Sequence, residues 1–198
     1  MHVVMFGDQH VESLGGAQVS MRLQREFLER AGHTVTIVAP ALHGRLCPRA
    51  RSRRMAALAP DPLLNQQLRN ESWMLSVDNA HAVHPNYADK HDEHHSPKLG
   101  AGAVIKVNRN QRYATDSEGA ARLRLLAERE GVGIQTFVTR ADLACGSTIG
   151  PITATETGIA TTDLGVPTLG MHSIRELACA ADVPQLISLL QAFYRRAA

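Results

Sequence analysis

Short apolar runs alternate with stretches of helical spacing along the chain. Buried parallel strands of α/β proteins read as short, continuous apolar runs of this kind. Helices instead repeat their apolar positions every three or four residues. The runs that predict strands are 3–6, 33–38, 73–77, 104–107 and 134–138, and those that predict helices are 17–32, 117–131 and the stretch from about residue 182. This order predicts an α/β fold with a sheet flanked by helices.

Two of the predicted helices have recognisable ends and faces. Asp116 and Ser117 can cap a helix that ends at Gly131. Its apolar face is predicted to be Ala121, Leu125 and Leu126. The last helix carries one apolar stripe that predicts core packing. That stripe comprises Val183, Leu186, Ile187, Leu190, Phe193 and Tyr194.

The front of the chain differs in character from the rest. Residues 1–44 are predicted to form a βαβ unit with Gly15 and Gly16 just before its helix. The backbone amides of this glycine pair could bind a phosphate, or the pair could form an ordinary tight turn. Residues 45–60 contain an arginine run without interleaved aromatic residues, which predicts an exposed linker rather than a nucleic-acid site. Residues 61–198 follow as a separate domain. Proteases are expected to cut the linker first.

Composition narrows the class of protein. The chain of 198 residues has 44% hydrophobic and 20% charged residues, which suits a globular protein. Its three cysteines include no CxxC pair, so neither a disulfide framework nor a thiolate zinc site is expected. No apolar stretch is long enough for a membrane helix. Asp8 interrupts the apolar opening too early for a signal peptide, so we expect a cytoplasmic protein without a membrane or nucleic-acid partner.

Histidines gather between residues 81 and 95, where five of the ten occur. A local zinc site is one interpretation, but Pro85 interrupts a shared helix and the HExxH motif is missing. Asp78 offers a second interpretation because it follows the apolar run 73–77. A carboxylate there lies at the carboxyl end of a strand, where open α/β sheets bind ligands. This interpretation makes Asp78 a metal ligand and most of the histidines its neighbours.

Six motifs occur in order in the rest of the chain. They are SVDNAHAVHPNY at 76–87, KH at 90–91, VIKVN at 104–108, NQRYAT at 110–115, CGSTIGP at 145–151 and MHSIRE at 171–176. Together they resemble the aspartyl aminopeptidase family of dinuclear zinc exopeptidases, from about residue 62 to 194. The resemblance implies the three-layer α/β fold of zinc exopeptidases, here incomplete, a peptide substrate and a homo-oligomer.

The same resemblance assigns roles to five residues. It implies that Asp78 ligates one zinc ion and His172 the other, and that His81, Lys106 and Tyr113 contact the substrate. An enclosed lysine would attract an acidic side chain, which fits removal of N-terminal Asp or Glu. Three of these roles have a structural alternative: Asp78 as a strand-end cap, Lys106 as an edge-strand lysine and Tyr113 as a core aromatic. The family order predicts that all five meet in one concave site.

Parts of the family's site are missing from the sequence. The family also uses an earlier histidine ligand, a bridging aspartate and an adjacent pair of glutamates, and this sequence contains no Glu-Glu pair. The family's dimerisation domain is absent as well. We therefore expect a truncated or rearranged C-terminal part of a metallo-aminopeptidase with little activity, and we assign no catalytic residue.

The alternatives are a non-catalytic remnant and a fragment of a glycosyltransferase. Residues 1–40 resemble the start of two-Rossmann-domain glycosyltransferases that use nucleotide sugars. That resemblance implies that Gly15 and Gly16 lie beside the donor phosphates or the acceptor.

Overall fold

The computed structural model describes residues 2–6, 26, 29–30, 32, 34–38, 61–140 and 142–196. The chain divides into two compact units, residues 1–66 with 197–198 and residues 67–196. In the first unit, strands β1 (His2–Phe6) and β2 (Thr34–Val38) pair in parallel. Gly15, Gly16 and the predicted linker 45–60 lie outside the described residues, as does most of the predicted helix 17–32.

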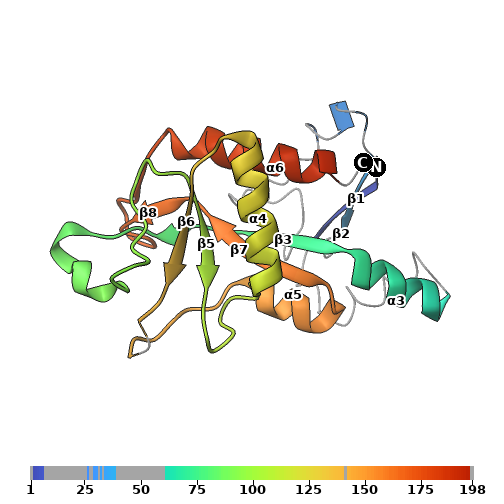
Figure 1. The fold of residues 1–198 in the computed structure, drawn as a ribbon, viewed down its shortest axis with the longest axis horizontal. Helices are drawn as coiled ribbons and strands as arrows, with labels where there is room; N and C mark the ends of the chain where they lie inside the picture. The colour runs from blue at the N-terminus through green and yellow to red at the C-terminus, as the bar shows by residue number, and fades with distance from the viewer. Residues whose placement is uncertain are drawn as a thin grey trace. The chain divides into compact units, whose positions relative to one another are not determined.

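The second unit contains a four-stranded mixed sheet in the order β3-β7-β5-β6 (Figure 1). Strands β3 and β7 are parallel, as are β5 and β6, whereas β5 and β7 run antiparallel. The chain continues from β3 into β4 and from β7 into β8, and these strands form a smaller sheet in the order β4-β8-β9. The strands are β3 (Trp73–Val77), β4 (Ala80–His81), β5 (Ala103–Val107), β6 (Ile134–Val138), β7 (Ala160–Gly165), β8 (Pro167–Leu169) and β9 (Leu177–Ala178).

Helices α4 (Ser117–Glu130) and α6 (Asp182–Arg196) cover one face of the larger sheet, and α5 (Ile149–Thr157) lies against the other. Helix α3 (Pro62–Glu71), which buries no residue, precedes β3, and a 3-10 segment η1 (Pro85–Lys90) follows β4. Ile105 of β5 and Leu164 of β7 pack with α4 and α6 in the main core. Because side chains alternate along a strand, Lys106 and Asp163 belong to the opposite face, where Asp163 meets α5. The expected α/β architecture with helices flanking a sheet is confirmed.

Helix α4 begins and ends where the sequence predicts. Asp116 accepts a hydrogen bond from the Gly119 amide at 2.6 Å, and Gly131 closes the helix in the left-handed conformation that glycine tolerates best. The predicted apolar face is wrong by about one position, because Ala121 and Leu125 are exposed. The buried side instead comprises Gly119, Ala120, Leu123, Leu126 and Ala127.

The stripe predicted for α6 is also partly wrong. Val183 and Ile187 are exposed, while Leu186, Leu189 and Ala192 are buried against the sheet. Helical spacing alone places the stripe within about one residue, and the packing partners then select its centre.

Strands β7 and β8 occupy stretches that the sequence does not predict as strands, since their threonines, glycines and proline give no apolar run.

Gly165 lets two strands approach closely at the end of β7. A Cβ atom on this residue would lie 1.4 Å from the carbonyl oxygen of Asp78. The Asp78 amide donates to the Leu164 carbonyl at 2.9 Å, which fixes the chain at the point where β3 ends. Glycine at this position therefore sets where Asp78 emerges from the sheet.

Candidate functional site

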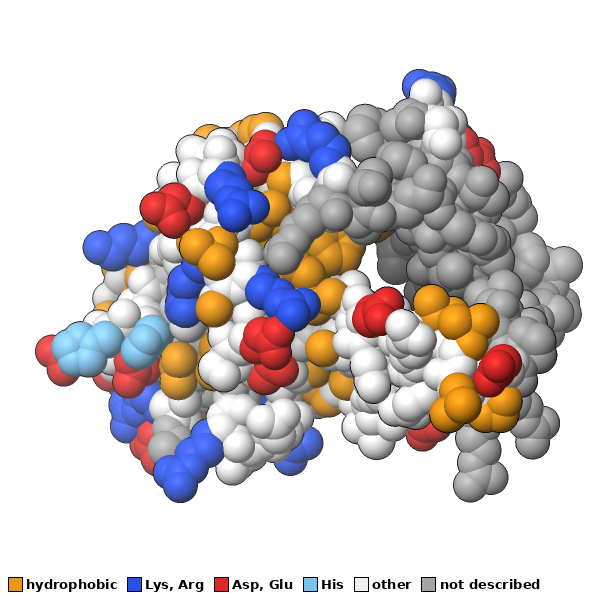
Figure 2. Space-filling model, turned by 45° about the vertical axis from the view of Figure 1, so that its right-hand side comes forward, with side chains coloured by type: hydrophobic (Ala, Val, Ile, Leu, Met, Phe, Trp, Pro, Cys, Tyr) orange, Lys and Arg blue, Asp and Glu red, His pale blue; other side chains and the backbone are white. Residues whose placement is uncertain are grey.

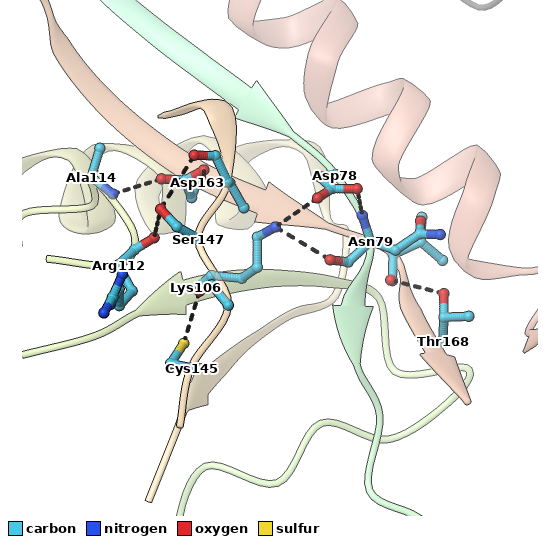
Figure 3. A network of polar contacts seen from close by, with 12 residues as sticks. Asp78, Asn79, Lys106, Arg112, Ala114, Cys145, Ser147, Asp163 and Thr168 are labelled. Carbon is cyan, nitrogen blue, oxygen red and sulfur yellow. Dashed lines mark hydrogen bonds and ion pairs between the residues drawn. The ribbon is translucent and has the colours of Figure 1, made fainter. Parts of the chain in front are cut away.

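A buried lysine lies at the centre of the face opposite α4 and α6. Lys106 is 1% exposed and comes from β5, which is an inner strand between β7 and β6. Its ammonium donates to the carbonyl oxygen of Asn79 at 3.2 Å and lies 3.9 Å from a carboxylate oxygen of Asp78 (Figure 3). The alternative of an edge-strand lysine is therefore wrong.

Burial leaves this ammonium only partly compensated. Desolvation is the main cause that lowers the pKa of Lys106, and the charges of Asp78 and Asp163 oppose it. Asp78 itself is well exposed, with 62% of its side chain accessible, so it pairs weakly with the lysine through solvent. A buried cation with one hydrogen bond and one exposed counter-charge can bind a further anion.

Tyr113 covers the lysine from the other side. The ammonium of Lys106 lies 5.3 Å from the centre of the Tyr113 ring, which is within range of a cation–π contact. Tyr113 is 6% exposed and packs against Phe137, so it is also a core aromatic. Burial and a hydrogen bond with Cys145 raise the pKa of its hydroxyl, which stays protonated at neutral pH and keeps a hydrogen to donate.

A buried carboxylate that the sequence analysis missed supports these groups. Asp163 is fully buried and accepts hydrogen bonds from the Ala114 amide and the Thr148 hydroxyl, each at 2.6 Å (Figure 3). It therefore joins the segment of Tyr113 to the start of α5. Gly150 allows this, because a Cβ atom there would lie 2.5 Å from both carboxylate oxygens of Asp163. The acidic residue was hard to find because its strand, β7, lacks an apolar run.

Three histidines lie beside this cluster. His81 follows Ala80 in β4, and burial lowers its pKa. The charges of His91, His172 and Lys106 lower the pKa further, so these groups are within electrostatic range of His81. His172 lies in the loop between β8 and β9 with a positive φ of 68°, and its amide donates to Glu176. The structure thus places Asp78 and Tyr113 next to Lys106, and the charges of Lys106 and His172 act on His81.

The donor set for zinc is only partial in the part of the chain that the structure describes. No group of three or more His, Cys, Asp or Glu side chains in that part is arranged to hold a metal ion. Zinc sites in proteins generally use three or four protein ligands. Asp78 and His172 alone therefore do not fit a complete zinc shell. That each holds one of two neighbouring metals remains a prediction.

Two other histidines, His94 and His95, are exposed or partly exposed. His95 contacts the carboxylate of Asp92 at 2.5 Å, and that hydrogen bond is the main cause that lowers the pKa of Asp92. His94 and Glu93 are exposed, and Figure 2 shows histidine and acidic side chains gathered at one edge.

No described helix has the length and apolar composition needed to cross a membrane.

Comparison with known proteins gives consistent matches. The sequence model of the family described as aminopeptidase I zinc metalloprotease (M18) matches residues 39–194. A curated relative, the probable M18 family aminopeptidase 2 of Stutzerimonas stutzeri (strain A1501), is 60% identical over 132 residues, which are 67% of this chain and 31% of the relative. The chain thus spans about a third of the length of the curated relatives it matches. The family match begins after residue 38 and gives no support to the glycosyltransferase alternative.

Solved structures agree with the fold. The cryo-EM structure of the Ape4 and Nbr1 complex contains a chain that is 43% identical, with a TM-score of 0.69 over 73% of this chain and 28% of that one. The structure titled S. cerevesiae mApe1 dodecamer is 26% identical, with a TM-score of 0.64 over 82% of this chain and 38% of that one. The expected resemblance to aminopeptidases of this kind is confirmed.

Proposed function

Because the chain belongs to the aminopeptidase I zinc metalloprotease (M18) family, we propose that it forms the substrate-binding side of an aminopeptidase site for peptides with an acidic N-terminal residue. The observation that carries this proposal is the buried ammonium of Lys106 beside Asp78 and Tyr113. A carboxylate of the substrate's first side chain would pair with that ammonium. Such a pair is strong where water is excluded.

The neighbouring residues have separate tasks in this proposal. Tyr113 keeps its proton and would donate it in a hydrogen bond to the oxygen of the scissile carbonyl as negative charge develops there. His81 is held largely neutral by its lowered pKa and can accept or donate one hydrogen bond to the peptide. Asp163 positions Tyr113 through the backbone of Ala114.

Zinc belongs to the family's chemistry, and Asp78 and His172 would each contribute one donor to it. Zinc supplies a Lewis acid and a metal-bound nucleophile in such enzymes. The described residues do not complete that set, and the sequence lacks the glutamate pair expected to include the general base. A positioned general base raises the rate of such a reaction roughly a hundredfold to ten-thousandfold. We therefore propose binding of acidic peptides together with hydrolysis near background for this chain.

Binding of matched peptides tests the proposal. A peptide with N-terminal Asp is titrated into the protein by calorimetry, beside the same peptide with N-terminal Asn. We expect the acidic peptide to bind at least about tenfold more tightly, which corresponds to about 1.4 kcal/mol. Lys106→Met should abolish that preference, whereas Lys98→Met, at an exposed lysine, should preserve it. Equal binding of the two peptides would contradict the proposal.

Hydrolysis is measured separately. Release of N-terminal Asp or Glu is assayed with added zinc, manganese or cobalt, beside an Asp78→Ala variant. Robust metal-dependent turnover that is lost in the variant would show that the chain, or copies of it together, completes the site. One similar solved structure is titled a dodecamer, and we propose that family members with the dimerisation domain self-associate. Light scattering after size exclusion measures whether this chain does so as well.

A further inference from the structure

A pocket of about 500 Å³ opens next to His81, and neither Lys106 nor its partners Asp78 and Asn79 line it. It is formed where β4, η1, β6 and β8 end. Apolar rings and chains make up much of its wall, with imidazoles between them. The lining includes His81, His84, His91, Phe137, Leu143 and Leu169.

His91 is the unusual member of this wall. Both of its ring nitrogens are shielded from solvent, and neither has a hydrogen-bond partner among the described residues. Its ring packs edge-on against Phe137 with centroids 5.7 Å apart, and its backbone bridges Thr139, so the imidazole is held in place. A buried polar group without a partner destabilises a fold, and a bound molecule can supply the missing hydrogen bonds.

His81 connects this pocket to the acidic-residue site. It lines the pocket, and its pKa is lowered by burial and by the charges of His91, His172 and Lys106. His81 and His91 also flank the same ring, since His81 lies 6.0 Å from the centroid of Phe137. Phe137 packs against Tyr113 as well, with ring centroids 6.3 Å apart, so the pocket wall adjoins the residue that covers Lys106. A peptide held by its first side chain at Lys106 would therefore reach this pocket with its next residue.

We propose that this pocket binds the second residue of the peptide, and that it selects an apolar or aromatic side chain there. The inference rests on the proposed function, because the first residue is placed by Lys106. A neutral imidazole has one donor and one acceptor nitrogen, and a peptide unit offers one carbonyl and one N–H. Phe137, Leu143 and Leu169 then provide the surface against which the side chain is buried.

The probes isolate the pocket from the acidic-residue site. N-acetyl-phenylalanine amide carries a peptide unit on each side of an aromatic side chain but neither a free amine nor a carboxylate. N-acetyl-glycine amide is its matched control without the side chain. Each is titrated while the carbon-bound imidazole protons are followed by NMR, with resonances assigned through single histidine variants.

We expect the phenylalanine probe to bind at least about tenfold more tightly than the glycine probe, because burying its ring is strongly favourable. It should shift the His91 and His81 resonances and leave that of exposed His94 unmoved. His91→Phe should weaken binding about fivefold or more through lost hydrogen bonds, while His94→Phe has no effect. If His91→Phe does not fold, the wild-type shifts and His91→Gln decide.

The outcomes separate this inference from the proposed function. Equal binding of the two probes, or an unmoved His91 resonance, would overturn the pocket even if the preference for acidic peptides holds. Conversely, Lys106→Met should leave binding of the phenylalanine probe unchanged. Loss of the acidic preference with retained probe binding would overturn the function and leave the pocket as an apolar peptide site.

Discussion

Replacing Lys106 by methionine should stabilise the fold while removing its affinity for acidic peptides. Methionine keeps the length and packing of the buried side chain but removes its charge. The ammonium gains about 1.5–3 kcal/mol from a charged hydrogen bond, up to about 2 from Tyr113, and at most about 1 from exposed Asp78. Its desolvation costs several kcal/mol, and the lowered pKa of Lys106 indicates that this cost dominates.

The expected change is therefore an increase in the free energy of unfolding of about 0–2 kcal/mol. For a unit of this size that corresponds to a rise of up to about 8 °C in Tm. Thermal and urea denaturation followed by circular dichroism measure it, with Lys98→Met as a surface control that should change stability by less than about 0.5 kcal/mol. A loss of more than about 2 kcal/mol in Lys106→Met would refute the reasoning, because the contacts would then outweigh desolvation.

The pH dependence provides a second check on Lys106. Its folded pKa lies below its ordinary value of 10.5, so between the two values the unfolded chain binds more protons than the folded chain. The free energy of unfolding contributed by this residue must therefore rise with pH in that window. The penalty is fully present below the folded pKa, so the advantage of the methionine variant should shrink as pH rises from there toward 10.5. An advantage that grows with pH would contradict the assigned cause.

Three further changes test the surroundings of the site. Gly165→Ala should destabilise the fold by about 1–3 kcal/mol, since its Cβ atom would overlap the backbone of Asp78, whereas Gly146→Ala has open space and should change little in the same denaturation assay. Asp163→Asn places an N–H against a donor and should cost about 1–3 kcal/mol, with weaker binding of the acidic peptide by calorimetry. Because the pKa of His81 is lowered in the folded chain, the unfolded chain binds more protons once pH falls below about 6.5, and the free energy of unfolding should decrease. The Tm measured from pH 7.5 to 5 should therefore fall, and His81→Leu should make that fall smaller.

The sequence by itself determined the elements with strong local signals. Strands β3, β5 and β6 coincide with short apolar runs, and α4 is bounded by Asp116 and Gly131, because caps and apolar periodicity act over a few neighbouring residues. Six ordered motifs also identified the family, and they predicted one site formed by Asp78, His81, Lys106, Tyr113 and His172. The motifs do not show by themselves that Asp78 and Lys106 lie 3.9 Å apart.

Tertiary structure decided what depends on pairing between distant segments. Whether Lys106 is an edge lysine or a buried cation depends on which strands flank β5, and the antiparallel neighbour β7 has no apolar run to predict it. The same strand brings Asp163 against Ala114 and Thr148, and Gly165 against Asp78, contacts between residues 15 to 87 positions apart. His91 likewise looks like any other histidine of its cluster until Phe137 and Thr139 enclose it. Burial and missing partners are properties of the packed chain, so local sequence patterns could not specify them.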